Sequence, residues 1–427
     1  DPPRLAGFGE KSEAKLLRGV GFLKTGTGRF PLGDVLPWAR SVEKELALVR
    51  GVTRVAIAGS ARRRRETAGD IDFLAIAKDS LAAMDFFVSM PDVREVIARG
   101  DTKASVRLAN GLQADLRVVP AASYGAALNY FTGSRDHNIA LRQIAQGKGL
   151  KLNEYGLFRG ETSIAGKTEE SVYAALGLPY IEPELREMGG EIAAALENRL
   201  PDLVGYRDLK GDLQVQTSWT DGAHTIIEMA LAARDAGLAY MVVTDHTKRL
   251  AMMGGLDERR LALQGKEIDE ANRSLTLDGI DFLILKGSEC DILKDGSLDL
   301  SDEALSALDV VGVSVHSYFD LPRDEQTARI VRAIRNPHAD ILFHPTGRKI
   351  NRRPAYDVDM DAIIAVAKET GTVLEADAFP DRLDLNAEHI RTCVERGVKI
   401  AIDSDAHDKA HFSVLEYGIA QARRGLA

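Results

Sequence analysis

Two carboxylates that lie two positions apart, Asp70 and Asp72, follow a basic run in residues 59–74. Side chains two apart in a strand point to the same face, so this pair would repel unless a cation lay between them. A divalent metal ion that also holds phosphate oxygens is the common solution. Before the carboxylates, Gly59 and Ser60 offer backbone amides and a hydroxyl to phosphate, and four arginines follow. The alternative is a solvated arginine-rich loop, but all three features fall within fourteen residues, which favours a metal-and-phosphate site.

The same segment reads Gly-Ser-x-Arg-Arg-x-x-Glu-x-x-Gly-Asp-x-Asp and resembles the nucleotidyltransferase signature of the family X DNA polymerases. That family adds a third catalytic carboxylate on a neighbouring strand. Asp115 alternates with apolar residues over 114–118, as a half-buried strand does, and matches that position. The resemblance therefore implies that Asp70, Asp72 and Asp115 are catalytic and hold two Mg²⁺ or Mn²⁺ ions.

Residues 129–138 and the chain that follows resemble the thumb of the same family, in which Tyr-Phe-x-Gly-Ser lies against the sugar of the incoming nucleotide. An aromatic ring beside a tight glycine backbone would leave no room for a ribose 2′-hydroxyl. Taken alone, the two aromatics would be read as core residues; the match over thirty residues favours binding. Asn138 would touch the base edge and Arg142 the template. The nucleotide- and template-binding residues that the resemblance implies are Gly59, Ser60, Arg63, Gly69, Tyr130, Phe131, Gly133, Asn138 and Arg142.

Residues 5–20 predict a glycine-rich turn that opens a short helix, and they resemble a helix-hairpin-helix. Such a motif grips a DNA phosphate through turn amides without reading bases. The DNA-backbone contacts implied are Gly7, Gly9 and Lys11. Relatives often begin with a small helical domain that binds a 5′-phosphate. None is found before residue 5, so this domain either lies outside the given numbering or is lacking, and we expect no lyase activity from the given chain.

From residue 207 onward, strand-like segments alternate with helical ones, which predicts a parallel, barrel-like α/β domain whose chemistry lies at the carboxyl ends of the strands. The expected strands are 239–244, 282–287, 310–315, 341–344, 373–376 and 399–402. Histidine and carboxylate residues cluster just after five of these strands. Any one of them could be a core histidine or a helix cap, but five such clusters favour a metal centre for zinc, manganese or iron.

These clusters resemble the PHP (polymerase and histidinol phosphatase) domain that bacterial family X polymerases carry behind the thumb. In that family the domain binds up to three metal ions and hydrolyses phosphoesters, often as a 3′–5′ exonuclease. The metal ligands that the resemblance implies are Asp221, His246, Glu289, His316, His344, Asp405 and His407.

The first PHP motif departs from the family pattern Asp-x-His-x-His, because Gln214 and Gln216 replace both histidines. A glutamine can coordinate only through a neutral amide oxygen, which is a poorer ligand for these metals than imidazole. By the family's sharing pattern, one ion would be left with Glu289 and His407 alone, so we expect two ions rather than three. The two sets that keep their ligands would be Glu289, His316 and His344, and Asp221, His246 and Asp405. Whether the barrel is a weakened exonuclease or a retained scaffold stays open.

The composition is that of an ordinary globular protein: 427 residues, 45% apolar and 28% charged. The sequence has no apolar run of membrane-spanning length, no signal peptide and only two cysteines, so we expect a cytoplasmic, nucleoid-associated protein without a membrane partner or a thiolate metal cluster. The net charge of −9 divides into +8 over residues 1–160 and −17 over the remainder. A basic front half suits a polyanion such as DNA.

We expect a multidomain α+β and α/β chain that acts as a monomer on gapped or primer–template DNA with dNTPs. Its parts would be helix-hairpin-helix fingers (1–49), a nucleotidyltransferase palm with a mixed sheet (50–124), a small thumb (125–178), a linker (179–205) and a PHP-type distorted (β/α)7 barrel (206–427). The leading hypothesis is a DNA-directed DNA polymerase for short-gap repair of the base-excision type. The alternatives are a PHP phosphoesterase or nuclease as the main activity, and a gapped-DNA-binding module without catalysis. The last is disfavoured because three carboxylates beside a phosphate channel would repel DNA.

Overall fold

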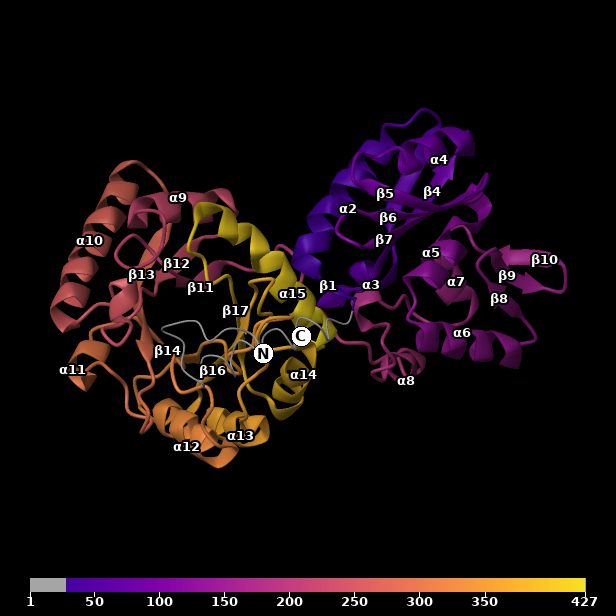
Figure 1. Ribbon diagram of the computed structural model, residues 1–427. Coiled ribbons are helices and arrows are strands. Elements are labelled where there is room, and N and C mark those ends of the chain that lie inside the picture. The colour runs from indigo at the N-terminus through magenta and orange to yellow at the C-terminus, as the bar shows by residue number, and fades with distance from the viewer. Residues whose placement is uncertain (1–27, 427) are drawn as a thin grey trace, which may run out of the picture. The chain divides into compact units, whose positions relative to one another are not determined.

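The computed structural model describes residues 28–426, and the chain forms two compact units (Figure 1). We call residues 26–202 the N-terminal unit and the residues from 203 onward the barrel unit. The division after Asp202 falls inside the stretch expected to be a linker. The expected DNA-backbone contacts Gly7, Gly9 and Lys11 lie outside the described residues.

A five-stranded mixed sheet forms the centre of the N-terminal unit. Its strand order is β2 (Val52–Ile57), β4 (Asp70–Ala77), β7 (Gln113–Val118), β6 (Lys103–Leu108) and β5 (Val93–Arg99). Only the β4–β7 pair is parallel; the other neighbours are antiparallel. Strand β2 ends at Ile57 and is only half-buried, because it lies at an edge of the sheet.

Helices cover the two faces of this sheet according to the period of two along β4. On one face, Phe73 meets Trp38 of α2 (Leu32–Ala47) and Phe87 of α4 (Ser80–Val88), with ring centroids 6.0 and 5.8 Å apart and edge-to-face geometry. On the other face, Leu74 packs with Tyr124 and other buried residues of α5 (Tyr124–Thr132). Asp70 and Asp72 share the parity of Leu74 and therefore belong to the α5 face.

Small elements follow α5 in the N-terminal unit. They are α6 (Arg135–Gly147), β8 (Lys151–Asn153), β9 (Gly156–Arg159), β10 (Thr162–Ala165), α7 (Glu169–Ala175), η2 (Pro183–Leu185) and α8 (Glu191–Leu196). Residues 179–202 belong to this compact unit, contrary to their expectation as a linker, because the Arg186 side chain is fully buried in it. Arg186 and Arg62 both pair with Glu169 of α7, at 2.7 and 2.6 Å.

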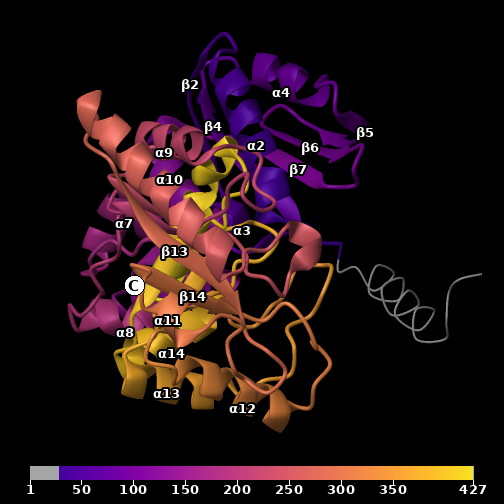
Figure 2. The ribbon, with the colours of Figure 1, turned by 90° about the vertical axis from the view of Figure 1, so that its left-hand side faces the viewer.

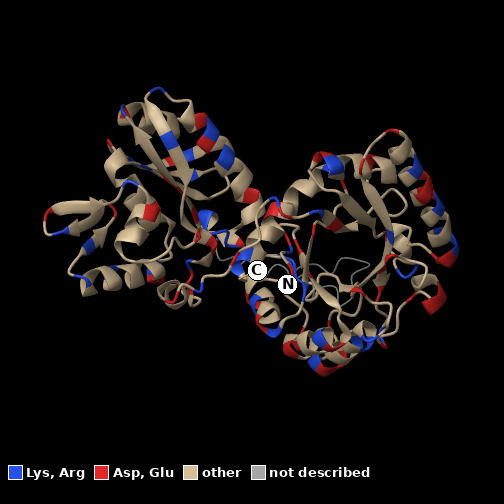
Figure 3. Ribbon diagram, turned by 180° about the vertical axis from the view of Figure 1, so that it is seen from behind, with Lys and Arg blue, Asp and Glu red and all other residues tan. Residues whose placement is uncertain are grey.

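The barrel unit contains seven parallel strands in sequential order. They are β11 (Gly211–Val215), β12 (Tyr240–Val243), β13 (Leu283–Asp291), β14 (Val310–Ser314), β15 (Ile341–Leu342), β16 (Val373–Asp377) and β17 (Ile400–Asp403). The helices outside them are α9 (Ile226–Asp235), α10 (Glu258–Leu277), α11 (Asp302–Leu305), α12 (Arg323–Ile334), α13 (Met360–Thr370), α14 (Ala387–Arg396) and α15 (Leu415–Arg424). Figures 1 and 2 both show α10 alongside β13. Charged positions of both signs lie on the outer helices (Figure 3).

The first and last strands nearly close the barrel. Val215 and Ala406 form a parallel β-bridge, and the backbone N–H of Gln216 donates to the Ala406 carbonyl at 2.8 Å. Beside this bridge, the backbone amide of Leu213 donates to Asp403 Oδ1 at 2.9 Å. The parallel barrel architecture expected from the alternating pattern is thus confirmed.

Strand β11 was not among the expected strands, because its inward positions are Asp212 and Gln214 rather than apolar residues. Both side chains are fully buried. Polar residues inside a barrel break the apolar pattern by which a strand is found in a sequence.

Candidate functional site

The three expected catalytic carboxylates come together at the centre of the N-terminal sheet. The parallel register of β4 and β7 places Asp72 directly beside Asp115, and Asp70 lies on the same face of β4. Gln113 Nε2 donates to Asp115 Oδ2 at 3.5 Å. The other oxygen, Oδ1, is buried, and no hydrogen bond reaches it from any residue that the structure describes.

The electrostatics of this cluster call for a cation. Burial, and after it the neighbouring charges of Asp70 and Asp115, raise the pKa of Asp72 to about 7. Two carboxylates this close cannot both ionise cheaply unless positive charge separates them. The orphaned oxygen of Asp115 and the all-oxygen donor set fit divalent ions such as Mg²⁺ or Mn²⁺.

The phosphate cradle is built against the carboxylates. Gly59 begins the short helix α3 (Gly59–Arg62), where a turn was expected, and its φ is +64°. A Cβ at this position would lie 2.6 Å from Asp72 Oδ2, so only glycine lets the backbone approach the carboxylate this closely. The amide of Ala58 also donates to the Asp72 carbonyl at 2.8 Å.

A pocket of about 760 Å³ opens beside the cluster. Eight of the nine residues expected to bind the nucleotide and template line it, together with Asp70 and Asp72. These eight are Gly59, Ser60, Arg63, Tyr130, Phe131, Gly133, Asn138 and Arg142. Gly69 does not line the pocket. Arg29 does, and its side chain lies against Gly69.

Of the two thumb aromatics, Tyr130 is exposed, whereas Phe131 is partly buried and packs against the core cluster that contains Leu74 and Tyr124. The ring centroids of Tyr130 and Phe131 lie 5.1 Å apart in edge-to-face geometry, and Tyr130 is 36% exposed. Asn138 of α6 donates through Nδ2 to the Tyr130 carbonyl at 2.7 Å, which fixes the end of α5 that carries both rings. The exposure of Tyr130 favours the binding interpretation for that ring, whereas Phe131 lines the pocket and also packs against the core.

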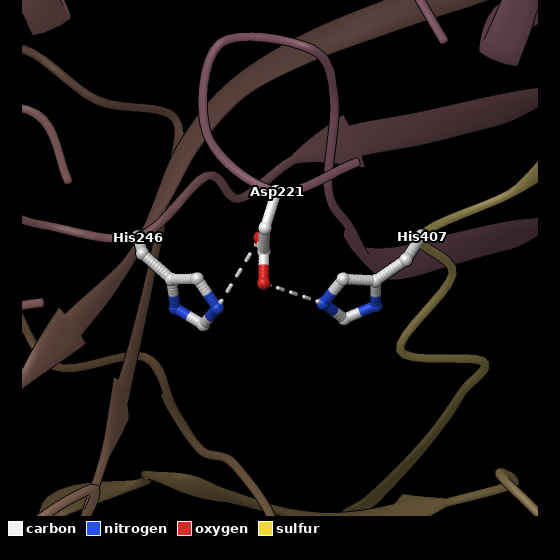
Figure 4. Close-up of side chains that lie close together, drawn as sticks. All are labelled: Asp221, His246 and His407. Carbon is white, nitrogen blue, oxygen red and sulfur yellow. Dashed lines mark ion pairs between the residues drawn. The ribbon is translucent and has the colours of Figure 1, made fainter. Parts of the chain in front are cut away.

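The barrel unit brings histidines and carboxylates together at the carboxyl ends of its strands. His246 and His407 both point at Asp221 (Figure 4), with Nε2 to carboxylate oxygen distances of 3.6 and 3.5 Å. In a second group, His246 lies with Glu289 and His316. Within each group of three, the ligand atoms all lie within 4.8 Å of one another. His246 therefore belongs to both candidate metal positions.

Glu289 is the buried centre of the second group. His316 Nε2 and His344 Nε2 approach its Oε1 at 3.0 and 2.8 Å, and His246 Nδ1 approaches its Oε2 at 3.3 Å. Burial opposes the charge of this carboxyl, but the surrounding histidines outweigh burial and lower its pKa well below the ordinary value. Nδ1 of His344 is buried without a hydrogen bond from the described residues. Imidazole and carboxylate donors of this kind fit zinc, manganese or iron.

The structure groups two of the expected ligands differently from the family's sharing pattern. His407 lies with Asp221 rather than with Glu289. Asp405, expected beside Asp221 and His246, has its carboxylate 3.6 Å from Arg382 Nε and 3.7 Å from His407 Nδ1.

Known proteins resemble the chain over nearly its whole length. A family model described as the DNA polymerase beta thumb matches residues 127–187. The DNA polymerase/3′-5′ exonuclease PolX of Bacillus subtilis strain 168 is 40% identical over 425 residues, which are 99% of this chain and 74% of that protein. The chain belongs to the family X DNA polymerases that carry a PHP domain.

Two further likenesses are weaker. A probable phosphatase of Thermoanaerobacter sp. strain X514 is 33% identical over 193 residues, which are 43% of this chain and 72% of that protein. A solved structure of Leishmania infantum polymerase beta in a ternary P/T complex covers 43% of this chain and 84% of its own, with 21% identity and a TM-score of 0.34, too low to carry an argument. Among the described helices, none has the length and apolar character needed to cross a membrane.

Several residues that line the pocket of this family X polymerase were not predicted from the sequence. Arg29, Arg65 and Arg135 also line it. Arg63 was the one arginine of the basic run expected to bind the nucleotide, and nothing around Arg29, thirty residues before the signature, pointed to the site. Arg62 of the same run pairs instead with Glu169.

The two glutamines of the PHP domain have different surroundings. Gln216 Nε2 donates to Glu289 Oε2 at 2.8 Å, so a neutral amide lies against an oxygen that would otherwise be open to a metal ion. Gln214 is buried, and within the described part of the chain neither of its amide atoms has a hydrogen-bond partner. The residues therefore fit the two groups around His246 better than a third position at β11. The sequence also missed Lys349, Arg353 and Arg382, which line the pocket of about 450 Å³ over these groups.

Proposed function

We propose that the N-terminal unit adds dNTPs to a primer 3′-hydroxyl at short gaps in DNA, as in base-excision repair, by two-metal phosphoryl transfer. The observation that carries this proposal is the β4–β7 register, which aligns Asp72 with Asp115 beside an arginine-lined pocket. Membership of the family X DNA polymerases makes the chain an enzyme; the gapped substrate and the repair role are the proposal.

Each part of the pocket has a task in this reaction. Asp70, Asp72 and Asp115 would hold Mg²⁺ or Mn²⁺, which when bound would lower the pKa of the primer hydroxyl and stabilise the charge that develops as pyrophosphate leaves. The Ser60 hydroxyl and the Arg63 guanidinium donate to the triphosphate oxygens, beside the Gly69 backbone.

The thumb residues select the sugar of the incoming nucleotide and contact its base and the template. Tyr130, Phe131 and Gly133 line the pocket and exclude a ribose 2′-hydroxyl by lack of room. Asn138 contacts the base edge and Arg142 the template strand.

The test is primer extension on gapped DNA with Mg²⁺ or Mn²⁺. We expect template-dependent extension that Asp115→Ala abolishes, with Asp101→Ala, a surface carboxylate in the loop before β6, as the matched control. Absence of extension by the unaltered chain, or extension that survives Asp115→Ala, would refute the proposal.

A DNA-binding role without catalysis makes a different prediction for the carboxylates. The double variant Asp70→Asn, Asp72→Asn removes negative charge near the DNA path. A mere binder would hold gapped DNA at least as tightly and would have no extension to lose. We expect DNA binding to be retained and extension to be lost.

A second activity, 3′–5′ exonuclease, is proposed for the PHP domain with two bound Zn²⁺, Mn²⁺ or Fe²⁺ ions. The two ligand groups that share His246 support it, and the Gln216–Glu289 hydrogen bond argues against a third ion. Shortening of the primer without dNTPs, lost in His316→Ala while extension is kept, is the expected result. No shortening by the unaltered chain would make the barrel a scaffold. The chain would act as a monomer on DNA in the cytoplasm.

A further inference from the structure

Two arginines of the proposed triphosphate pocket contact one carboxylate that no part of the catalytic scheme uses. Glu187 Oε1 accepts from Arg63 Nε at 2.9 Å, and its Oε2 accepts from Arg65 Nη1 at 3.0 Å. The Arg63–Glu187 contact joins residues 124 positions apart and is partly buried. A carboxylate held between two guanidinium groups in this way fixes both side chains through charge-assisted hydrogen bonds.

The backbone on either side of Glu187 is held in place. On one side, the Arg186 carbonyl accepts from the Ser134 amide at 3.0 Å, and the buried Arg186 side chain pairs with Glu169. On the other side, the Met188 amide donates to Glu191 Oε1 at 3.1 Å. Glu191 is in turn held by the buried His137 at 2.7 Å. The carboxylate of Glu187 is therefore presented from a fixed segment.

Glu187 supports the arginines from outside the pocket. Arg63 and Arg65 line the cavity, and Glu187 is not part of its lining. Arg63 is also held from a second direction, because its Nη1 donates to the Thr132 carbonyl. Contacts through Nε and Nη1 together fix the plane of the guanidinium. A carboxylate that competed with the triphosphate would lie on the cavity side of the arginines instead.

We propose that Glu187 is a positioning residue that preorganises Arg63 and Arg65 for the triphosphate of the incoming nucleotide. The inference rests on the proposed polymerase function of this pocket. A free arginine side chain has large rotamer freedom, which is lost when it binds phosphate. A pair of arginines already held in place loses less on binding, so the nucleotide binds more tightly. Glu187 acts through the arginines and touches neither the primer nor the carboxylate cluster.

The test is steady-state extension of gapped DNA by Glu187→Gln, which keeps the shape of the side chain and removes its charge. Loss of a charge-assisted hydrogen bond predicts about a tenfold rise in KM for dNTP. We expect kcat and the KM for DNA to stay as in the unaltered chain, because the carboxylate cluster and the DNA contacts are untouched. Glu170→Gln, an exposed glutamate of α7, makes the same change in net charge and is the matched control.

The outcomes separate positioning from its rivals. An unchanged KM for dNTP in a folded Glu187→Gln protein would overturn the inference, and so would a lower KM, which would mean that Glu187 competes with the triphosphate. A joint change in kcat and in both KM values would also overturn it, because that indicates a general structural defect. If Glu187→Gln does not fold, Glu187→Asp decides by the same criteria, since it keeps the charge on a shorter stem that cannot reach both arginines.

Failure of the proposed function gives a different result. If the unaltered chain does not extend primers, equilibrium binding of dNTP with Mg²⁺ to the DNA-loaded protein replaces KM as the measurement. Weaker dNTP binding by Glu187→Gln than by Glu170→Gln would then support the inference, and equal binding would overturn it.

Discussion

Replacing Glu169 by glutamine should destabilise the N-terminal unit. Glu169 is 4% exposed and joins Arg186, which is fully buried, to Arg62 of the signature segment. Glu169→Gln would leave both guanidinium groups without an anion at the centre of the cluster. An uncompensated buried charge is costly because it has lost both water and its partner.

Two independent estimates give the same loss of folding stability for Glu169→Gln. Burial alone would raise the pKa of Glu169, but hydrogen bonds and charges from Arg62 and Arg186 outweigh burial and lower it from 4.5 to about 2. Through proton linkage this shift corresponds to about 3 kcal/mol of folding stability at neutral pH. Removing one partner of a buried ion pair typically costs about 3–5 kcal/mol. We therefore expect a loss of about 3 kcal/mol.

The assay is urea unfolding of the full chain, followed by tryptophan fluorescence. The chain has two tryptophans, Trp38 in the N-terminal unit and Trp219 in the barrel unit, so a Trp219→Phe background reports on the N-terminal unit alone. With a slope of about 2 kcal/mol per M, the midpoint should fall by about 1.5 M urea. Glu170→Gln in the same background is the control and should leave the midpoint in place.

The pH dependence gives a second check. The pKa of Glu169 is lowered on folding, so its contribution is complete above pH 4.5, the unfolded value, and is lost as the pH falls towards 2. The difference between the Glu169→Gln variant and the unaltered chain should therefore be equal at pH 6 and pH 8. A midpoint shift no larger than that of the Glu170→Gln control, or a difference that changes between pH 6 and pH 8, would refute the reasoning.

Two further predictions concern the sites themselves. Gly59→Ala places a Cβ 2.6 Å from Asp72 Oδ2, so the carboxylate must move. A displacement of about 1 Å predicts about a 100-fold fall in the rate of primer extension. The control is Gly147→Ala, which should extend primers normally because nothing lies within 4 Å of its added Cβ. His246 belongs to both candidate metal groups and His407 to one, so elemental analysis after dialysis should find His246→Ala depleted of both PHP ions and His407→Ala of one, and equal depletion would contradict the shared-ligand geometry.

Much of both sites could be predicted because their residues form recognisable patterns within short segments of the sequence. The basic run and paired carboxylates of residues 59–74 form one continuous segment, and the polar clusters of the barrel each follow an apolar strand. The alternation around Asp115 also predicted a half-buried strand over 114–118, which lies within β7. By contrast, β11 escaped notice because its inward residues are polar.

The chemistry of this chain can be read from its amino-acid sequence: which carboxylates, arginines and histidines are present, and the spacing that resembles a nucleotidyltransferase signature and a PHP domain. The pairing of individual charges depends on the folded chain. Arg62 pairs with Glu169 from 107 positions away, and Gln216 donates to Glu289 from 73 positions away. Neighbouring arginines in a run look alike in a sequence, because local propensity carries no information on long-range partners. Packing assigns Arg62 to a buried structural pair and the next arginine, Arg63, to the lining of the cavity beside the carboxylates.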